Sequence, residues 1–119
     1  VMPILEDYCV GERQTIVEAI SAITENLSRC VVVCGDSGKV IGIVSEGDIL
    51  RHILEGVDLH APVYKLVSPA FHYLNDRDMQ KACELVREHG ITLIPIVDDD
   101  FYLCDTVTIF DVLEHLARE

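Results

Sequence analysis

Two short motifs place a hydroxyl three residues before an aspartate, Ser45 before Asp48 and Thr108 before Asp111. Each motif follows an apolar, β-branched run and precedes a helix-like segment, so we expect it where a buried strand enters a helix. The positive end of a helix favours a phosphate group, to which a hydroxyl can donate, and a carboxylate there can accept two charge-assisted hydrogen bonds from a vicinal diol. A hydroxyl for phosphate beside a carboxylate for ribose predicts binding of a nucleoside phosphate.

The same spacing also has a purely structural interpretation. A Ser or Thr at the N-cap of a helix, with a carboxylate three residues later, forms a capping box that satisfies free backbone N–H groups. A cap of this kind stabilises a helix by roughly 0.5 to 2 kcal/mol. The local sequence by itself favours this capping role.

The two motifs belong to two copies of one unit. Residues 10–56 recur at 73–119 without insertion or deletion, and Asp48 falls on Asp111 at an offset of 63 residues. Two copies in so short a chain are expected to pack as a pseudo-symmetric pair, with equivalent residues converging on the groove between them. We place the first unit at residues 1–60 and the second at 61–119.

Each unit predicts a lead-in strand, a helix, two adjacent strands and a second helix. Thr15 and Asp78 are the expected N-caps of the two first helices, and a Gly-Asp-Ser-Gly turn at 35–38 predicts a hairpin. The first lead-in strand is expected at residues 4–9. We expect strand 30–34 to pair with 39–44, and strand 93–97 to pair with 101–107. The connector between the units is expected at 57–77, with one helical turn at 63–67.

Composition excludes several classes of partner. The formal charge is −12, with 21 acidic against nine scattered basic residues, so the chain would repel a nucleic acid backbone. No apolar run approaches the roughly 20 residues of a membrane-spanning helix, and we see no signal peptide. The sequence opens abruptly at Val1, so we expect it to be a piece of a longer polypeptide.

The five cysteines, an odd number, are expected to be reduced core residues of a cytoplasmic protein. No Cys-x-x-Cys or His-x3-His pattern supports a structural metal site. Cys83 and His89 lie six residues apart, and no motif supplies a carboxylate to orient the histidine. We therefore expect no catalytic set, no metal site and no enzymatic activity of the chain itself.

Two segments carry a resemblance to a known family. The run Gly38-Lys39-Val40-Ile41-Gly42-Ile43-Val44-Ser45-Glu46-Gly47-Asp48-Ile49-Leu50, after Val31-Val32-Val33, resembles the signature of the cystathionine-beta-synthase (CBS) domain. His89-Gly90-Ile91-Thr92-Leu93-Ile94-Pro95-Ile96-Val97-Asp98 resembles that family's central strand. The resemblance covers nearly the whole chain as a tandem pair, called a Bateman module.

The resemblance implies a mixed α/β (α+β) fold of two β-α-β-β-α repeats related by a pseudo-two-fold axis. It also implies disc-shaped homodimers, with an adenosine-containing ligand such as AMP, ADP, ATP or S-adenosylmethionine between the repeats. Asp48 and Asp111 would then bind ribose and Ser45 and Thr108 would approach phosphate. Arg29 and Thr92 match positions that flank the base or phosphate. Arg29 is equally well explained as a solvated side chain, and Thr92 is better explained as a plain strand residue.

The second copy departs from the family pattern at two positions. Asp105 replaces Gly42 and Phe110 replaces Gly47, and the ring of Phe110 would fill or wall a pocket beside Asp111. We therefore expect the cleft that contains Asp48 to be the better site.

The segment 46–63 resembles, more narrowly, CBS pairs attached to sugar-phosphate nucleotidyltransferases and sugar-phosphate isomerases. The predicted function is a regulatory module that senses an adenosine nucleotide and modulates an attached or associated enzyme. The alternatives are a structural dimerisation module without a ligand and a cation-responsive CBS pair like those of magnesium transporters.

Overall fold

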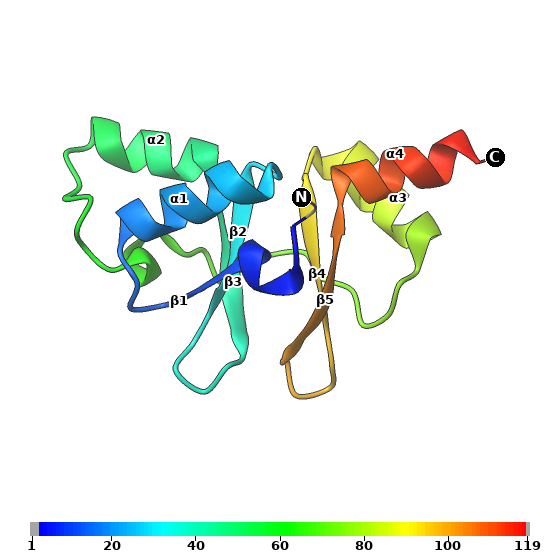
Figure 1. Ribbon diagram of the computed structural model, residues 1–119, viewed down its shortest axis with the longest axis horizontal. Helices are drawn as coiled ribbons and strands as arrows, with labels where there is room; N and C mark the ends of the chain where they lie inside the picture. The colour runs from blue at the N-terminus through cyan, green and yellow to red at the C-terminus, as the bar shows by residue number, and fades with distance from the viewer. Residues whose placement is uncertain (1–2, 119) are drawn as a thin grey trace.

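The chain folds into two similar halves that lie side by side, each with a β-hairpin and two helices (Figure 1). The computed structural model describes residues 3–118, and its extents are 45 × 29 × 29 Å. In both halves the helices gather at one end and the hairpin turns lie at the other. The expected pair of α/β repeats with pseudo-two-fold symmetry is confirmed.

The first repeat begins with a 3-10 turn and a short strand. Its elements are η1 (Leu5–Tyr8), β1 (Cys9–Gly11), α1 (Ile16–Asn26), β2 (Cys30–Cys34), β3 (Val40–Ser45) and α2 (Glu46–Leu54). β1 pairs in parallel with β2, and β2 pairs antiparallel with β3. The expected Thr15 capping box begins α1, because the Thr15 hydroxyl accepts from the backbone N–H of Glu18.

The second repeat follows a connector that contains one 3-10 turn, η2 (Val63–Leu66), as expected. Its elements are α3 (Met79–His89), β4 (Leu93–Val97), β5 (Leu103–Thr108) and α4 (Ile109–Ala117). Asp78 caps α3 by accepting from the N–H of Lys81, and β4 pairs antiparallel with β5.

The lead-in strands differ from expectation in both repeats. Residues 5–8 form a 3-10 turn and the first strand begins only at Cys9. In the second repeat the lead-in shrinks to one parallel bridge, in which the N–H of Leu74 donates to Pro95 and that of Val97 donates to Leu74. The next ladder bond would need an N–H on Pro95, which proline lacks. At the same position the first repeat has Val32, which pairs with Cys9.

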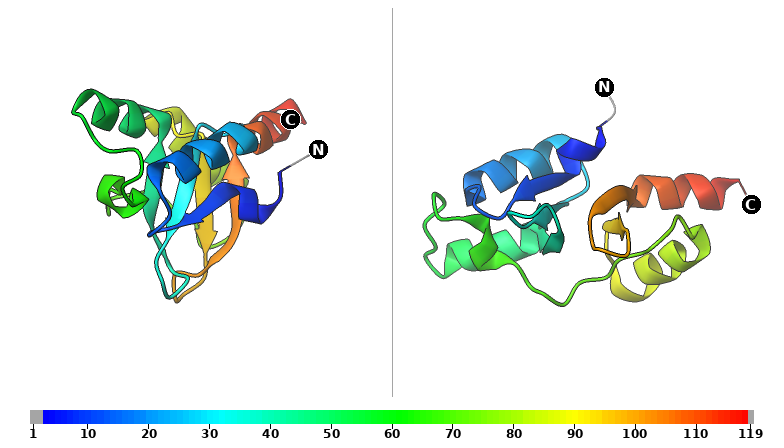
Figure 2. Two further views of the ribbon diagram at one scale, coloured as in Figure 1. Left: turned by 60° about the vertical axis from the view of Figure 1, so that its left-hand side comes forward. Right: turned by 90° about the horizontal axis from the view of Figure 1, so that it is seen from below.

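The two faces of β2 pack against different partners. Val31 and Val33 point to the cluster formed with α1 and α2, whereas Cys30 and Val32 join a cluster that includes Leu93 and Val97 of β4. Alternation along a strand explains the division, because successive side chains point to opposite faces. The hairpins therefore meet back to back through apolar side chains of the two repeats. Figure 2 shows the helices on the outer sides of the pair.

The connector crosses β3 at Gly42. A Cβ atom there would lie 2.3 Å from Val67 and 2.7 Å from the carbonyl oxygen of Ser68. Ser68 also bridges Ile43. The corresponding residue of the second repeat, Asp105, is exposed, so a side chain fits there.

Candidate functional site

Both hydroxyl–aspartate motifs stand at strand-to-helix junctions and form capping boxes. The Ser45 hydroxyl accepts from the N–H of Asp48 at 3.1 Å, and Asp48 Oδ2 accepts from the N–H of Ser45 at 2.9 Å. Thr108 and Asp111 repeat the arrangement at 3.2 and 2.8 Å. The structural interpretation of the motifs is thus realised at the N-termini of α2 and α4.

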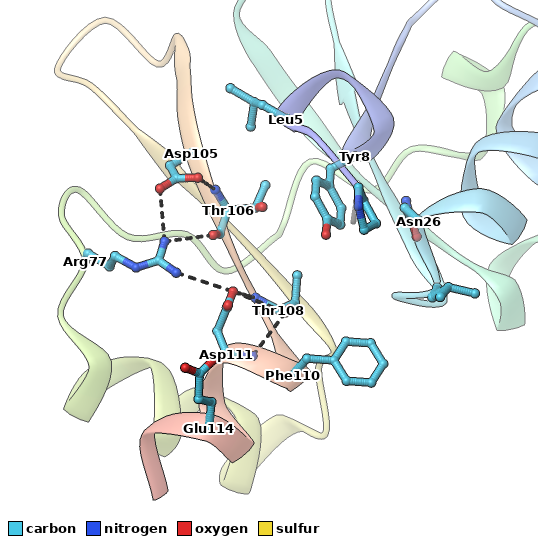
Figure 3. A pocket seen from close by; sticks show the side chains of 12 residues that line it. Leu5, Tyr8, Asn26, Arg77, Asp105, Thr106, Thr108, Phe110, Asp111 and Glu114 are labelled. Carbon is cyan, nitrogen blue, oxygen red and sulfur yellow. Dashed lines mark hydrogen bonds and ion pairs between the residues drawn. The ribbon is translucent and has the colours of Figure 1, made fainter. Parts of the chain in front are cut away.

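A cavity of about 460 Å³ lies beside the second motif, between the two repeats. Leu5 and Tyr8 of η1 and Asn26 of α1 line it from the first repeat. Its other wall carries Thr108, Phe110 and Asp111, where β5 enters α4 (Figure 3). Both repeats build this cleft, as expected for a site created by duplication.

The carboxylate of Asp111 faces this cavity and is held mainly through one oxygen. Oδ2 accepts from the N–H of Thr108 at 2.8 Å and from its hydroxyl at 3.1 Å, and it lies 3.4 Å from Arg77 Nη2. Every hydrogen bond and ion pair of this carboxylate within residues 3–118 is made by Oδ2. Oδ1 is therefore the oxygen that a ligand hydroxyl would meet.

Arg77 provides the positive charge of the cleft. Its Nη1 lies 3.0 Å from Asp105 Oδ2 and donates to the carbonyl of Thr106 at 3.1 Å, so the guanidinium bridges β5 and the start of α4 (Figure 3). No motif in the sequence marks this residue. Its equivalent in the first repeat, Gln14, instead accepts from the N–H of Gly11 and donates to Glu18. The available signal was Asp105, an acidic replacement for Gly42 with which a nearby basic side chain could pair.

Two aromatic rings enter the cleft from opposite repeats. Tyr8 projects from η1 and Phe110 from the first turn of α4 (Figure 3). Burial raises the pKa of the Tyr8 phenol, and the negative charges of Asp111 and Asp7 add to the effect. The ring of Phe110, 56% exposed, walls the cavity and leaves the space beside Asp111 open.

The first motif faces a smaller cavity of about 290 Å³, lined also by Phe71, His72 and Ile91. Here both oxygens of Asp48 have partners, since Oδ2 binds the N–H of Ser45 and Oδ1 forms an ion pair with Arg51. Burial, the largest influence, raises the pKa of Asp48, but hydrogen bonds from Ser45 and the contact with Arg51 outweigh it, and the pKa is lowered overall. The carboxylate of Asp48 thus has both oxygens paired, whereas the contacts of Asp111 within residues 3–118 all use Oδ2.

Arg29 and Thr92 line a neighbouring cavity of about 340 Å³ together with Ser45. The guanidinium of Arg29 is 73% exposed and pairs with Glu46 at 3.3 Å. Thr92 donates its hydroxyl to the backbone carbonyl of Ser28 and lies 3.3 Å from the sulfur of Cys30. Thr92 thus ties the second repeat to the first, and both residues lie away from Asp111.

Among residues 3–118, no group of three or more His, Cys, Asp or Glu side chains is arranged to hold a metal ion. Within the same residues, no helix has both the length and the apolar character needed to cross a membrane.

Comparison with known proteins agrees with this architecture. Hypoxic response protein 1 of Mycobacterium tuberculosis is 25% identical over 113 residues, which cover 92% of this chain and 78% of that protein. A CBS domain pair/ACT domain protein from Thermotoga maritima superposes with a TM-score of 0.78 at 26% identity, over 97% of this chain and 92% of that one. A CBS domain protein from Pyrobaculum aerophilum, solved in complex with AMP, superposes with a TM-score of 0.74 at 24% identity, covering 93% and 91%.

The family model of the CBS domain matches twice, over residues 4–55 and 68–118, and the two matches coincide with the two repeats of the structure. The chain therefore belongs to the CBS domain family, as a tandem pair of CBS repeats.

Proposed function

We propose that this chain is a regulatory module without catalytic activity of its own, which binds an adenosine-containing nucleotide in the cleft at Asp111. The observation that carries the proposal is the cavity of about 460 Å³ between the repeats. It is lined by the carboxylate of Asp111, the guanidinium of Arg77 and the rings of Tyr8 and Phe110. The AMP complex of the Pyrobaculum aerophilum relative supports the choice of ligand.

The chemistry of the cleft assigns each part of the ligand to a side chain. Oδ1 of Asp111 accepts from the ribose hydroxyls, and the rings of Tyr8 and Phe110 provide apolar faces for the base. The Thr108 hydroxyl already donates to Asp111, so phosphate is better matched to Arg77 than to Thr108. This modifies the expected role of Thr108, which becomes the residue that orients the carboxylate.

The charge of the cleft favours a ligand with few phosphates. Three acidic residues, Asp105, Asp111 and Glu114, line it with Arg77, and Arg77 is already paired with two of them. A triphosphate would bring more negative charge than one guanidinium can offset. We therefore expect AMP to bind more tightly than metal-free ATP.

The test is a titration of the purified chain with AMP, in which calorimetry measures the Kd and thermal denaturation measures the melting temperature. Saturating AMP should raise the melting temperature, and Asp111→Asn should raise the Kd by roughly 10- to 100-fold, because one hydrogen bond to a charged acceptor is worth about 1.5–3 kcal/mol. The 2′-deoxy analogue should lose a similar factor. Asp48→Asn serves as the matched variant in the other cleft and should change the Kd little.

A second substitution separates the site from general charge effects. Asp99→Asn removes the same charge from the exposed hairpin turn and should leave AMP binding unchanged. If AMP, ATP and S-adenosylmethionine all fail to bind or to shift the melting temperature, the proposal is wrong.

A ligand bound between the repeats can influence an attached or associated enzyme by changing how the two repeats pack against each other. A ligand that contacts both repeats shifts that packing by its differential affinity for two arrangements, typically 1–3 kcal/mol. The proposed receiver is an enzyme attached or associated with the chain. A sugar-phosphate nucleotidyltransferase or isomerase is the candidate suggested by residues 46–63.

A dimerisation role is the second candidate, and exposed apolar side chains on the helices favour it. Leu50 and Leu54 of α2 are 60% and 87% exposed, and Leu113 and Leu116 of α4 are 56% and 43% exposed. A groove of about 320 Å³ between α1 and α2 is lined mainly by isoleucine and leucine. Both repeats thus present an apolar helix face that a second copy could cover in a homodimer.

A further inference from the structure

One hydroxyl that lines the Asp111 cleft has no partner in the fold. It belongs to Thr106 of β5, which borders the cavity of about 460 Å³ and is only 5% exposed. The backbone N–H of Thr106 donates to Asp105 Oδ1 at 2.8 Å, and its carbonyl accepts from Arg77 Nη1 at 3.1 Å. The hydroxyl, by contrast, makes no hydrogen bond with any other of residues 3–118.

This hydroxyl opens into the cavity. Among the buried and half-buried residues of 3–118, every side-chain N or O atom that is fully shielded from solvent has a hydrogen-bond partner. The Thr106 hydroxyl has none, so it keeps some accessible surface. Val107 packs in the cluster with α3 and α4, and the side chains before and after it, Thr106 and Thr108, therefore point the opposite way, to the first repeat. In Figure 3 Thr106 lies on the side of β5 that faces Tyr8, whereas Arg77 approaches from the other side.

Two other neutral polar side chains that line the cleft are already used by the fold. The Thr108 hydroxyl accepts from the N–H of Asp111 and donates to its carboxylate. The amide of Asn26 donates to two backbone carbonyls and accepts from the N–H of Ser28. Thr106 differs from both, because its hydroxyl is held in place by a buried strand while its hydrogen-bonding capacity is left for a ligand.

The equivalent position of the first repeat carries no polar group. At the offset of 63 residues Thr106 falls on Ile43, which lines the smaller cavity beside Asp48. Isoleucine offers only apolar contact, whereas a hydroxyl both donates and accepts hydrogen bonds. The two clefts share a capping motif but differ at this wall, so they select different chemical groups.

We propose that Thr106 is a specificity-determining residue of the Asp111 cleft, whose hydroxyl binds the polar group at C6 of a purine base, an inference that rests on the proposed function. Asp111 accepts from the ribose, and the ring of Tyr8, which Thr106 faces, packs against the base. Thr106 and Thr108 are about 7 Å apart along the strand, which separates the contact with the base edge from the capping motif that holds the sugar.

A hydroxyl at this place discriminates among purines by what they carry at C6. It accepts from the amino group of adenine and donates to the carbonyl of hypoxanthine, so both bases satisfy it. A purine without a substituent at C6 satisfies neither role and leaves the Thr106 hydroxyl covered by the base without a partner. A buried polar group without a partner costs affinity, so the unsubstituted purine binds more weakly.

The experiment titrates the purified chain calorimetrically with AMP and with purine riboside 5′-monophosphate, which lacks the amino group. The Kd of the second ligand should be roughly 2- to 10-fold higher, the effect of one neutral hydrogen bond. Thr106→Val replaces the hydroxyl with a methyl group, so AMP should bind more weakly by a similar factor and the two ligands should bind alike. Thr106→Ser retains the hydroxyl and should retain the discrimination. Ile43→Val, at the equivalent position of the other cavity, should retain it too.

The melting temperature of the ligand-free chain separates a role in binding from a role in the fold. Thr106→Val should not lower it, because the hydroxyl has no protein partner to lose. A lower melting temperature, equal weakening of both ligands, or unchanged discrimination in Thr106→Val would each overturn the proposal. Equal weakening would place the contact on the sugar or phosphate instead. AMP binding to the parent chain with unchanged discrimination in Thr106→Val refutes this inference alone, whereas absence of AMP binding refutes the proposed function with it.

Discussion

At the scale of single residues, the two capping aspartates differ in what remains available to a ligand. Asp48 uses one oxygen for the Ser45 N–H and the other for Arg51. Asp111 uses Oδ2 for Thr108 and for Arg77. Both carboxylate oxygens of the first motif are therefore paired, whereas in the second motif the contacts among residues 3–118 use only Oδ2 and leave Oδ1 to accept from a ligand.

The capping role leads to a prediction on stability. Ser45→Ala and Thr108→Ala should each lower the free energy of unfolding by about 0.5–2 kcal/mol, because each leaves an N–H at the start of α2 or α4 without its acceptor. Urea denaturation followed by circular dichroism measures the change. Thr108→Ser keeps the acceptor and should stay near the parent value, and equal losses in Thr108→Ser and Thr108→Ala would show that the methyl group matters instead.

At the scale of elements, the helices α2 and α4 serve two surfaces. Their N-termini face the clefts, while their outer faces carry exposed leucines. Figure 1 shows both helices at the same end of the molecule, away from the hairpin turns. A second copy that covered these faces would be able to transmit changes at the clefts through the helices themselves.

The exposed helix faces predict the oligomeric state. The chain should sediment as a dimer, and Leu50→Glu combined with Leu113→Glu should convert it to a monomer, because each substitution places a charge in an apolar contact. Analytical ultracentrifugation measures the mass. Tyr102→Glu is the control and should leave the dimer intact, because Tyr102 lies in the hairpin between β4 and β5, at the end of the molecule away from the helices. A parent chain that is already monomeric would rule this interface out.

At the scale of the whole molecule, the connector between the repeats packs closely on β3 because Gly42 has no side chain. Gly42→Ala would place a Cβ atom 2.3 Å from Val67 and should cost about 1–3 kcal/mol of stability, because the connector must shift away from β3. Gly47→Ala is the matched control, since its Cβ atom would meet only the Ser45 hydroxyl at 3.7 Å. Thermal denaturation compares the two, and similar melting temperatures for both variants would contradict the steric argument.

The sequence by itself determined the repeat, the order of helices and paired strands, and the two capping motifs. These depend on local periodicity, on turn residues and on a fixed offset of 63 residues, all of which are written along the chain. The lead-in of the second repeat is shorter than predicted for a reason that is also local, since Pro95 lacks the N–H that the next ladder bond would need.

Only the tertiary structure decided which side chains line each cleft and how the two capping carboxylates are paired. Arg77 reaches Asp105 across 28 residues of sequence, and Tyr8 enters a cavity whose other wall is α4. Such contacts depend on how two packed repeats place distant segments, and no spacing along the chain encodes that arrangement.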